Sequence, residues 1–138
     1  MASLIYNSCI FDLAKGNIDF DSNTFKAMLV TSTYVPNQGS HTKRSDITNE
    51  VTGTGYTAGG ATCSVTVTLD SANSRVNVSL GSLSFTTATI TARGCVYYRS
   101  RGGDATADEL VAYNDFGGNI SSTGATFAIA TSTLIMQN

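Results

Sequence analysis

The acidic side chains best placed to take part in a reaction are Asp104, Asp108 and Glu109. They lie in or beside one polar stretch near Arg99 and Arg101. Paired carboxylates are what glycoside hydrolysis uses, one as the acid and one as the base or nucleophile. The chain has no tryptophan for the aromatic platform that usually lines such a site. The pattern therefore favours a solvated loop, or an ion-paired contact with a neighbouring subunit, over a small hydrolase.

Histidine and cysteine could also supply a nucleophile, a base or a metal ligand, but they are sparse. His41 is the only histidine, and it lies in a polar stretch after Gly39 and Ser40. Thiol catalysis needs a histidine beside the cysteine, and a structural zinc site needs four convergent ligands. We predict a surface-loop histidine, buried free thiols, and no catalytic, cofactor or metal site. The cysteines, which form no CxxC pair, are Cys9, Cys63 and Cys95.

Two short stretches resemble binding motifs without completing them. Residues 53–58 match the loose dinucleotide pattern GxGxxA, but a strand rather than a helix is expected after them. Residues 19–23 look like the first half of a calcium loop, but Thr24 and Val30 stand where that loop needs glycine and glutamate. We predict a connecting loop with glycines at positive φ, and a turn held by Asp and Asn side chains. An irregular calcium site stays open.

The elements that would position these residues are mostly strands. Residues 63–80 alternate apolar and polar side chains around the polar turn 71–74, which is typical of a hairpin with one buried face. Residues 24–32 are apolar on both faces, as in a central strand that is covered on two sides. Further strands are expected over residues 83–86, 88–99, 109–116 and 126–136, with a turn at 117–119.

One short helix is expected near the N-terminus. Asn7 or Ser8 could cap it and Gly16 would end it, with an apolar side formed by Ile10, Leu13 and Ala14. A single helical turn is also expected within residues 45–51. Together these elements predict an all-β fold: a single antiparallel β-sandwich domain over residues 1–138, for which a jelly roll is one arrangement, with a short N-terminal helix.

The composition favours contact over reaction. Charged residues make up 13% of the chain, against about 25% in an average protein. A surface rich in hydroxyls and poor in charge loses little when a partner covers it, which favours a homo-oligomer, a dimer or trimer; threonine's preference for strands explains the composition equally well. The net charge is −2 and the basic residues are scattered, so nucleic acid is not an expected partner. No apolar run reaches the length of a membrane span.

Four blocks of the sequence are similar to a family of small tailed-bacteriophage virion proteins: residues 25–37, 46–61, 88–93 and 110–117. The stretch from Asn49 to Gly60 is the specific part. The resemblance covers most of the chain and implies a non-enzymatic structural protein, a capsid decoration or cement protein that binds the major capsid protein. It implies location on the capsid surface of the virion, after synthesis in the host cytoplasm. A neck or tail accessory protein stays open.

Partner contacts are expected in three loops, residues 36–45, 53–60 and 100–108. The N-terminal segment 2–6 could dock on a neighbour or complete the chain's own core. A second hypothesis is a carbohydrate-binding module for host attachment, in which exposed tyrosines stack on a sugar ring: Tyr97, Tyr98 and Tyr113. The candidate contact residues are Leu4, Ile5, Tyr6, Asn37, His41, Tyr56, Arg99, Arg101, Asp104 and Asp108.

Overall fold

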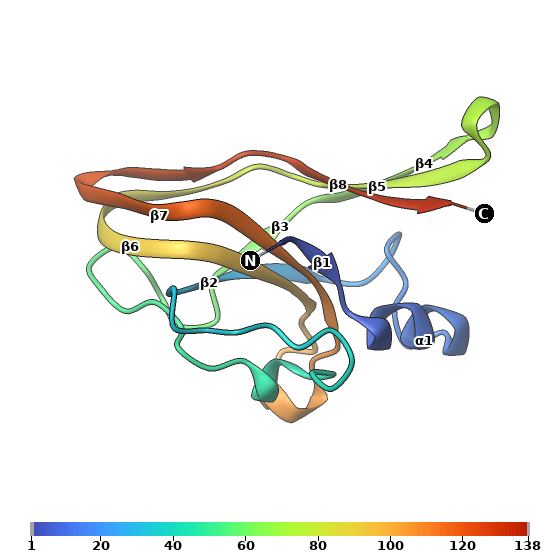
Figure 1. Ribbon diagram of the computed structural model, residues 1–138, viewed down its shortest axis with the longest axis horizontal. Helices are drawn as coiled ribbons and strands as arrows, with labels where there is room; N and C mark the ends of the chain where they lie inside the picture. The colour runs from blue at the N-terminus through green and yellow to red at the C-terminus, as the bar shows by residue number, and fades with distance from the viewer. Residues whose placement is uncertain (1, 138) are drawn as a thin grey trace.

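Two antiparallel sheets pack face to face in the computed structural model, which describes residues 2–137 (Figure 1). One sheet has five strands in the order β1-β7-β6-β2-β3, and the other has three in the order β4-β5-β8. The predicted all-β, sandwich-like fold with one short helix is confirmed. The elements are β1 (Leu4–Ile5), α1 (Asn7–Lys15), β2 (Phe25–Val30), β3 (Ala61–Cys63), β4 (Val65–Asp70), β5 (Arg75–Leu80), β6 (Leu83–Arg99), β7 (Leu110–Ile129) and β8 (Ser132–Gln137).

The long strands β6 and β7 form one ribbon that takes part in both layers. Their pairing is interrupted between Phe85 and Ala88, where Thr87 (φ 50°) and Gly124 (φ 59°) have left-handed backbone. The ribbon turns back on itself at this end of the molecule (Figure 1). One half lies beside β2 and β1, and the other half continues into β5 and β8, which pair with each other.

Two boundaries within this ribbon differ from those expected. The separate strands predicted over 83–86 and 88–99 are one bulged strand, β6. The turn predicted at 117–119 is wrong, because these residues lie inside β7, between the partners of Gly94 and Ala92. A glycine-rich bulge and a hairpin turn have the same local sequence preferences, so the sequence alone did not separate them.

The main core fills the space between the two layers. The five-stranded sheet contributes Phe25, Leu29 and Tyr97, each at most 1% exposed. Burying a large apolar side chain of this kind stabilises the fold by about 1.5–3 kcal/mol. The facing sheet and the ends of the ribbon contribute Val78, Leu80, Phe85, Phe127, Ile129 and Leu134.

The predicted hairpin is confirmed as β4 and β5, with two corrections. Cys63 is not part of it, because this residue belongs to β3 in the other sheet and the chain crosses between layers at Ser64. The apolar face is not buried throughout, because Val67 is 43% exposed and Leu69 is 73% exposed. The hairpin extends past the body of the sandwich (Figure 1).

A second apolar cluster lies on the outer face of the five-stranded sheet, beneath the loops. Met28 and Val30 of β2 and Val96 of β6 pack there with four tyrosines and a leucine. Strand β2 is therefore covered on both faces and lies between β6 and β3, which confirms the prediction for residues 24–32. The tyrosines are Tyr6, Tyr34, Tyr98 and Tyr113, and the leucine is Leu110.

Helix α1 begins and ends as expected but presents a different face. Gly16 ends it with φ 79°. The residue at the N-cap is Tyr6, with no side-chain cap, so the capping prediction for Asn7 or Ser8 is wrong. The buried residues are Cys9 and Asp12, whereas Ile10 is 61% exposed. The pairing of β1 with β7 fixes how the helix starts, and this tertiary constraint sets its buried face.

Candidate partner-binding surface

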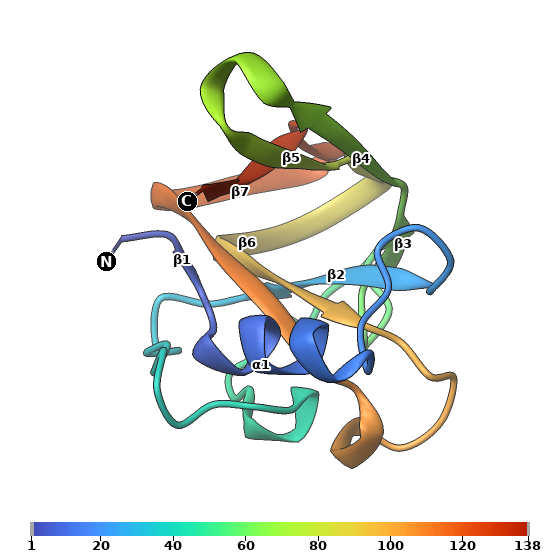
Figure 2. The ribbon, with the colours of Figure 1, turned by 90° about the vertical axis from the view of Figure 1, so that its right-hand side faces the viewer.

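Loops from distant parts of the chain gather on the outer side of the five-stranded sheet, away from β4, β5 and β8 (Figures 1 and 2). Backbone bonds join the 42–46 segment to the end of the 100–109 loop: the Arg44 N–H donates to the Asp108 carbonyl at 2.9 Å, and the Leu110 N–H donates to the Thr42 carbonyl at 3.2 Å. We call the exposed surface of residues 36–60 and 100–107 the loop face.

A network of ion pairs fixes the 100–109 loop from beneath. Glu109 is 1% exposed, and its carboxylate accepts hydrogen bonds from the Arg101 Nε at 2.8 and 3.1 Å. Lys43 lies 3.7 Å from the same carboxylate, and Arg99 lies 3.8 Å from it. Arg99 also donates to the carbonyl of Asn17. One buried acid thereby ties three basic side chains to the end of β7.

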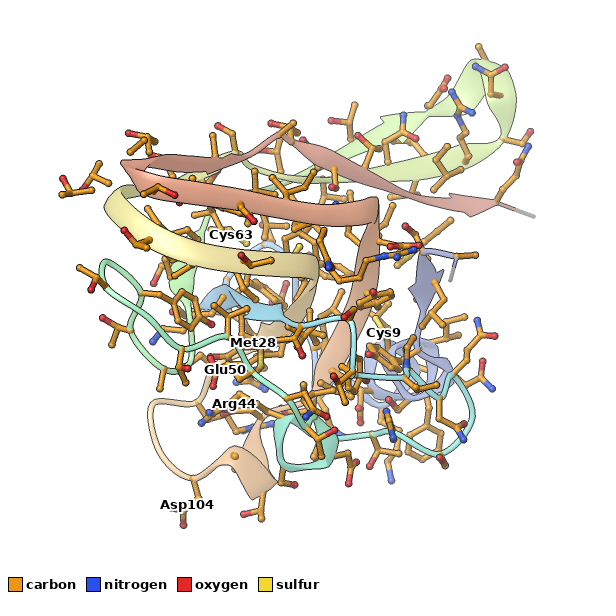
Figure 3. All side chains as sticks on the ribbon, turned by 60° about the vertical axis from the view of Figure 1, so that its left-hand side comes forward. Cys9, Met28, Arg44, Glu50, Cys63 and Asp104 are labelled. Carbon is orange, nitrogen blue, oxygen red and sulfur yellow. The ribbon has the colours of Figure 1, made fainter. Side chains whose placement is uncertain are left out.

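Asp108 makes a second buried pair beside the first. Its carboxylate is 2.7 Å from the Arg44 Nε and accepts the Arg101 N–H at 2.9 Å. The Arg44 guanidinium lies over the Tyr98 ring, 5.2 Å from its centroid. Figure 3 shows Asp104 at the outer end of the loop, with Arg44 and Glu50 between it and the sheet. Asp108 and Glu109 therefore form ion pairs within the chain, whereas Asp104 is exposed at the loop tip.

The electrostatics of this network do not suit Glu109 to the role of a general acid. Burial acts to raise the pKa of Glu109, but the hydrogen bond from Arg101 and the charges of Lys43 and Arg101 outweigh it, so the pKa lies below its ordinary value. A general acid needs a raised pKa. Glu109 therefore stays ionised and positions the loop. The Arg44 Nε donates to the Asp108 carboxylate at 2.7 Å and holds it in place.

A chain of hydrogen bonds holds the 34–41 loop. The Tyr6 and Tyr34 hydroxyls are 2.8 Å apart, and the Tyr34 hydroxyl is 2.8 Å from the His41 Nδ1. The Asn37 N–H also donates to this nitrogen, at 3.3 Å. Burial raises the pKa of Tyr34 to about 12, so its hydroxyl stays protonated. His41 is half-buried in this loop and acts as an anchor.

The glycine-rich loop 53–60 is fastened in the same manner. The Glu50 carboxylate accepts the Tyr56 hydroxyl at 2.6 Å and the Gly59 N–H at 2.7 Å. Gly60 (φ 79°) lies so close to β2 that a Cβ would be 1.8 Å from the Ala27 carbonyl oxygen. The predicted connecting loop with glycines at positive φ is confirmed, since strand β3 follows it.

The structure separates the predicted contact residues into exposed and buried sets. Asn37, Arg101 and Asp104 are exposed on the loop face. Tyr6 and Asp108 are buried at 0% and 1%, so neither can reach a partner from the folded chain. The half-buried residues are Leu4 and Ile5 in β1, His41, Tyr56 and Arg99.

Segment 2–6 completes the chain's own fold. Leu4 and Ile5 pair with Tyr113 and Ala112 of β7, and the Tyr6 ring enters the second cluster. The strand thereby covers one edge of the five-stranded sheet. Of the two roles considered for this segment, completion of the core is the one that the contacts support.

The tyrosines considered for sugar stacking are inside the protein. Tyr97, Tyr98 and Tyr113 are each 1% exposed. Tyr98 donates to the Gly59 carbonyl, and Tyr113 packs edge-on against Tyr34, 5.9 Å between centroids. Their rings are core side chains, and the stacking platform expected of them is not formed.

The Asp19–Asn23 segment is a self-contained turn. The Asp19 carboxylate accepts the Asp21 N–H at 2.9 Å and the Ser22 hydroxyl at 2.7 Å, while the Asn23 side chain accepts the Asp19 N–H at 2.7 Å. Nowhere among residues 2–137 do three side chains of His, Cys, Asp or Glu gather as a metal ion would require. In the same part of the chain no helix has the length and hydropathy of a membrane span.

Lys43, Arg44 and Glu50 fasten the loops, and sequence reasoning did not identify them. The helical turn expected within 45–51 is instead a 3₁₀ turn at Arg44–Asp46, whose Asp46 carboxylate accepts the Thr42 and Lys43 N–H groups at 2.8 and 3.0 Å. The sequence offered one local signal for this turn, an acidic residue, Asp46, at the end of a short polar run.

No family model matches the chain, and no curated protein or solved structure matches it.

Proposed function

We propose that this chain is a non-enzymatic structural protein of a tailed-bacteriophage particle: a decoration or cement protein on the capsid surface that binds the major capsid protein. The resemblance of the sequence to small virion proteins, whose specific part is residues 49–60, motivates this role. The proposal includes synthesis in the host cytoplasm and assembly onto the shell as a homo-oligomer.

The observation that carries the proposal is the preorganised loop face. Three loops that are distant in sequence are locked into one surface by the buried carboxylates of Asp108 and Glu109 and by Glu50. A surface that is already ordered loses little conformational entropy on binding. On a symmetric shell the same contact repeats many times, so a modest interaction at each site gives a durable coat.

Co-sedimentation with mature shells that lack this protein tests the proposal. Saturable binding of many copies per shell is the expected result. Binding of a handful of copies would assign the protein to the neck or tail instead, and no binding would overturn both roles.

A matched pair of threonine substitutions locates the contact. Thr106→Lys adds a charge to the exposed tip of the loop face, and we expect it to weaken shell binding at least tenfold. Thr126→Lys adds the same charge at an exposed position of β7, outside that face, and should bind as the wild type does. Equal binding by both variants would show that the loop face is not the contact.

A further inference from the structure

Strand β8 forms a free edge of the three-stranded sheet. It pairs with β5 along one side, and the strand order β4-β5-β8 leaves its other side without a neighbour. Figure 2 shows the end of β8, marked C, at one border of this sheet and β4 at the other. Alternate residues of an antiparallel strand direct their N–H and C=O groups to the same side. Half of these groups in β8 therefore point outward, and no backbone group within residues 2–137 bonds to them.

This edge lacks the features that natural sheets use to prevent pairing with another chain. Edge strands are usually protected by lysine, by proline or by charges that point inward. No charged residue and no proline occurs from Phe116 to Gln137. The other edge strand, β4, ends in Asp70, which forms an ion pair with Arg75 at 3.0 Å. The outer edge of β8 is therefore the one that can accept a further strand without burying a charge.

The middle of the edge also carries an apolar side chain in water. Ile135 is 48% exposed. Its side chain lies on the outer face of the sheet, because its neighbours Leu134 and Met136 pack against the core on the inner face. Strand β1 does not cover this edge, since a groove of about 440 Å³ lies between β8 and β1. A strand paired with β8 would cover Ile135 from the side.

The sequence of β8 is complementary to itself. The five residues Thr133–Gln137 follow the order polar, apolar, apolar, apolar, polar, which is the same in both directions. Antiparallel pairing centred on Ile135 sets this residue opposite its own copy and sets Leu134 opposite Met136. The two polar ends meet in the same way, so every pair joins side chains of one kind on one face of the sheet. The strand that fits this edge is therefore β8 of a second copy.

We infer that the chain forms a two-fold dimer in which β8 pairs antiparallel with β8 of a second copy, centred on Ile135. The two three-stranded sheets then become one continuous sheet. Such an interface is isologous, since each copy presents the same edge to the other. The inference rests on the homo-oligomeric part of the proposed function and names the surface that forms the oligomer.

The geometry of this dimer suits a protein that coats a surface. Inner faces join inner faces in the continuous sheet, so the two-fold axis runs perpendicular to it. The loop face of each copy lies on the far side of the five-stranded sheet, away from β8 (Figure 1). Both loop faces therefore point in the same direction, and one shell surface can bind both.

Sedimentation velocity over a range of protein concentrations tests the dimer without any shells present. The wild type is expected to form a dimer of the 14.4 kDa chain. Ile135→Lys sets two positive charges opposite each other at the axis and should raise the dimer dissociation constant at least tenfold. Ile10→Lys makes the same change on α1, where Ile10 is 61% exposed, and should leave the constant within twofold. Both positions are accessible to solvent, so circular dichroism should show an unchanged fold.

Mixing two variants tests the register. Ile135→Glu alone should dimerise as poorly as Ile135→Lys, because like charges again meet at the axis. An equimolar mixture of the two should dimerise at least tenfold more tightly than either variant alone, because opposite charges then face each other. This recovery is specific to a dimer in which residue 135 meets its own copy.

Three results would overturn the inference: a monomeric wild type, a dimer that Ile135→Lys leaves intact, or a mixture that shows no recovery. A monomeric wild type whose shell binding is lost in Ile135→Lys would assign the edge to a strand of the shell protein instead. Dimerisation is measured without shells and shell binding with them. Failure of the dimer is therefore distinguishable from failure of the decoration role.

Discussion

Glu109 is the residue on which the loop face depends most. It is 1% exposed and faces Arg101, Lys43 and Arg99. Replacing it with Gln removes the charge and leaves three cations around a neutral amide. Because these cations are partly hydrated, we expect Glu109→Gln to lower the free energy of unfolding by about 2–4 kcal/mol.

Urea unfolding monitored by circular dichroism measures this loss. Asp104→Asn is the control, since Asp104 is exposed at the tip of the same loop, and its effect should stay within about 0.5 kcal/mol. If the two variants unfold at the same urea concentration, the buried network does not stabilise the loop.

The cysteines make a different prediction, because all three are buried free thiols. Burial raises the pKa of Cys9 to about 12, of Cys63 to about 11 and of Cys95 to about 12. The thiolate is the reactive form, so a thiol reagent at pH 8 should modify the native protein very slowly and the urea-unfolded protein at once. Mass spectrometry counts the adducts, and rapid native labelling of any of these residues would contradict the burial.

At the scale of elements, Gly60 is where one loop touches a strand. Its φ is 79°, and a Cβ there would overlap the Ala27 carbonyl oxygen. Gly102 has nearly the same backbone, φ 82°, with nothing within 4 Å of a Cβ. Gly102→Ala should therefore cost only the backbone strain, about 1 kcal/mol, whereas Gly60→Ala must also displace the loop from β2.

We expect Gly60→Ala to cost at least 2 kcal/mol more than Gly102→Ala, on the order of other severe backbone substitutions. Thermal unfolding of the two variants side by side gives the comparison. Equal melting temperatures would mean that the loop does not sit against β2 as described.

A strand could be predicted from the sequence where burial of its own side chains determines it, and could not where pairing with a distant strand does. Alternation located β4 and β5, and two-sided apolarity located β2, because burial acts directly on those side chains. The 20-residue strand β7 was divided in two, because Gly117 and Gly118 read locally as a turn. Only pairing with β6 keeps them in a strand, and a single sequence does not contain that partner.

The same limit applied to the candidate contacts. Asp104 and Arg101 are polar residues in a loop and proved exposed, but Asp108 looked no different and is buried. Its environment comes from Arg44, which is distant in sequence. Long-range ion pairs of this kind leave no periodic signal in the chain.

For the whole molecule, the carboxylates determine how stability responds to acid. The hydrogen bond from Arg93 lowers the pKa of Asp115 to about 2, and the pKa of Glu109 is lowered as well. Both groups bind protons more readily when the chain is unfolded, so their contribution is present above pH of about 4–5 and is lost as the pH falls toward 2.

The cysteine thiols determine how stability responds to high pH. Their raised pKa values favour the protonated form in the folded chain, so that contribution is present below pH of about 8.5 and is lost as the pH rises toward 11–12. Urea unfolding across this range should give a plateau between the two limits. A free energy of unfolding that keeps rising below pH 4 would contradict the lowered carboxylate values.

The folded-over ribbon also bears on how this chain reaches its native state. Tyr98 pairs with Leu110 across the 100–109 loop, and the pairing then runs outward to Leu83 and Ile129. Once the first cross-strand pair has formed, each later pair closes only a small additional loop, so the entropic cost of forming that pair is low. The β6–β7 ribbon is therefore expected to form first beside the 100–109 loop and then to extend toward the bend. It would act as a nucleus from which both sheets grow. Residues that are distant in sequence, such as Leu83 and Ile129, thereby come together through a series of short steps.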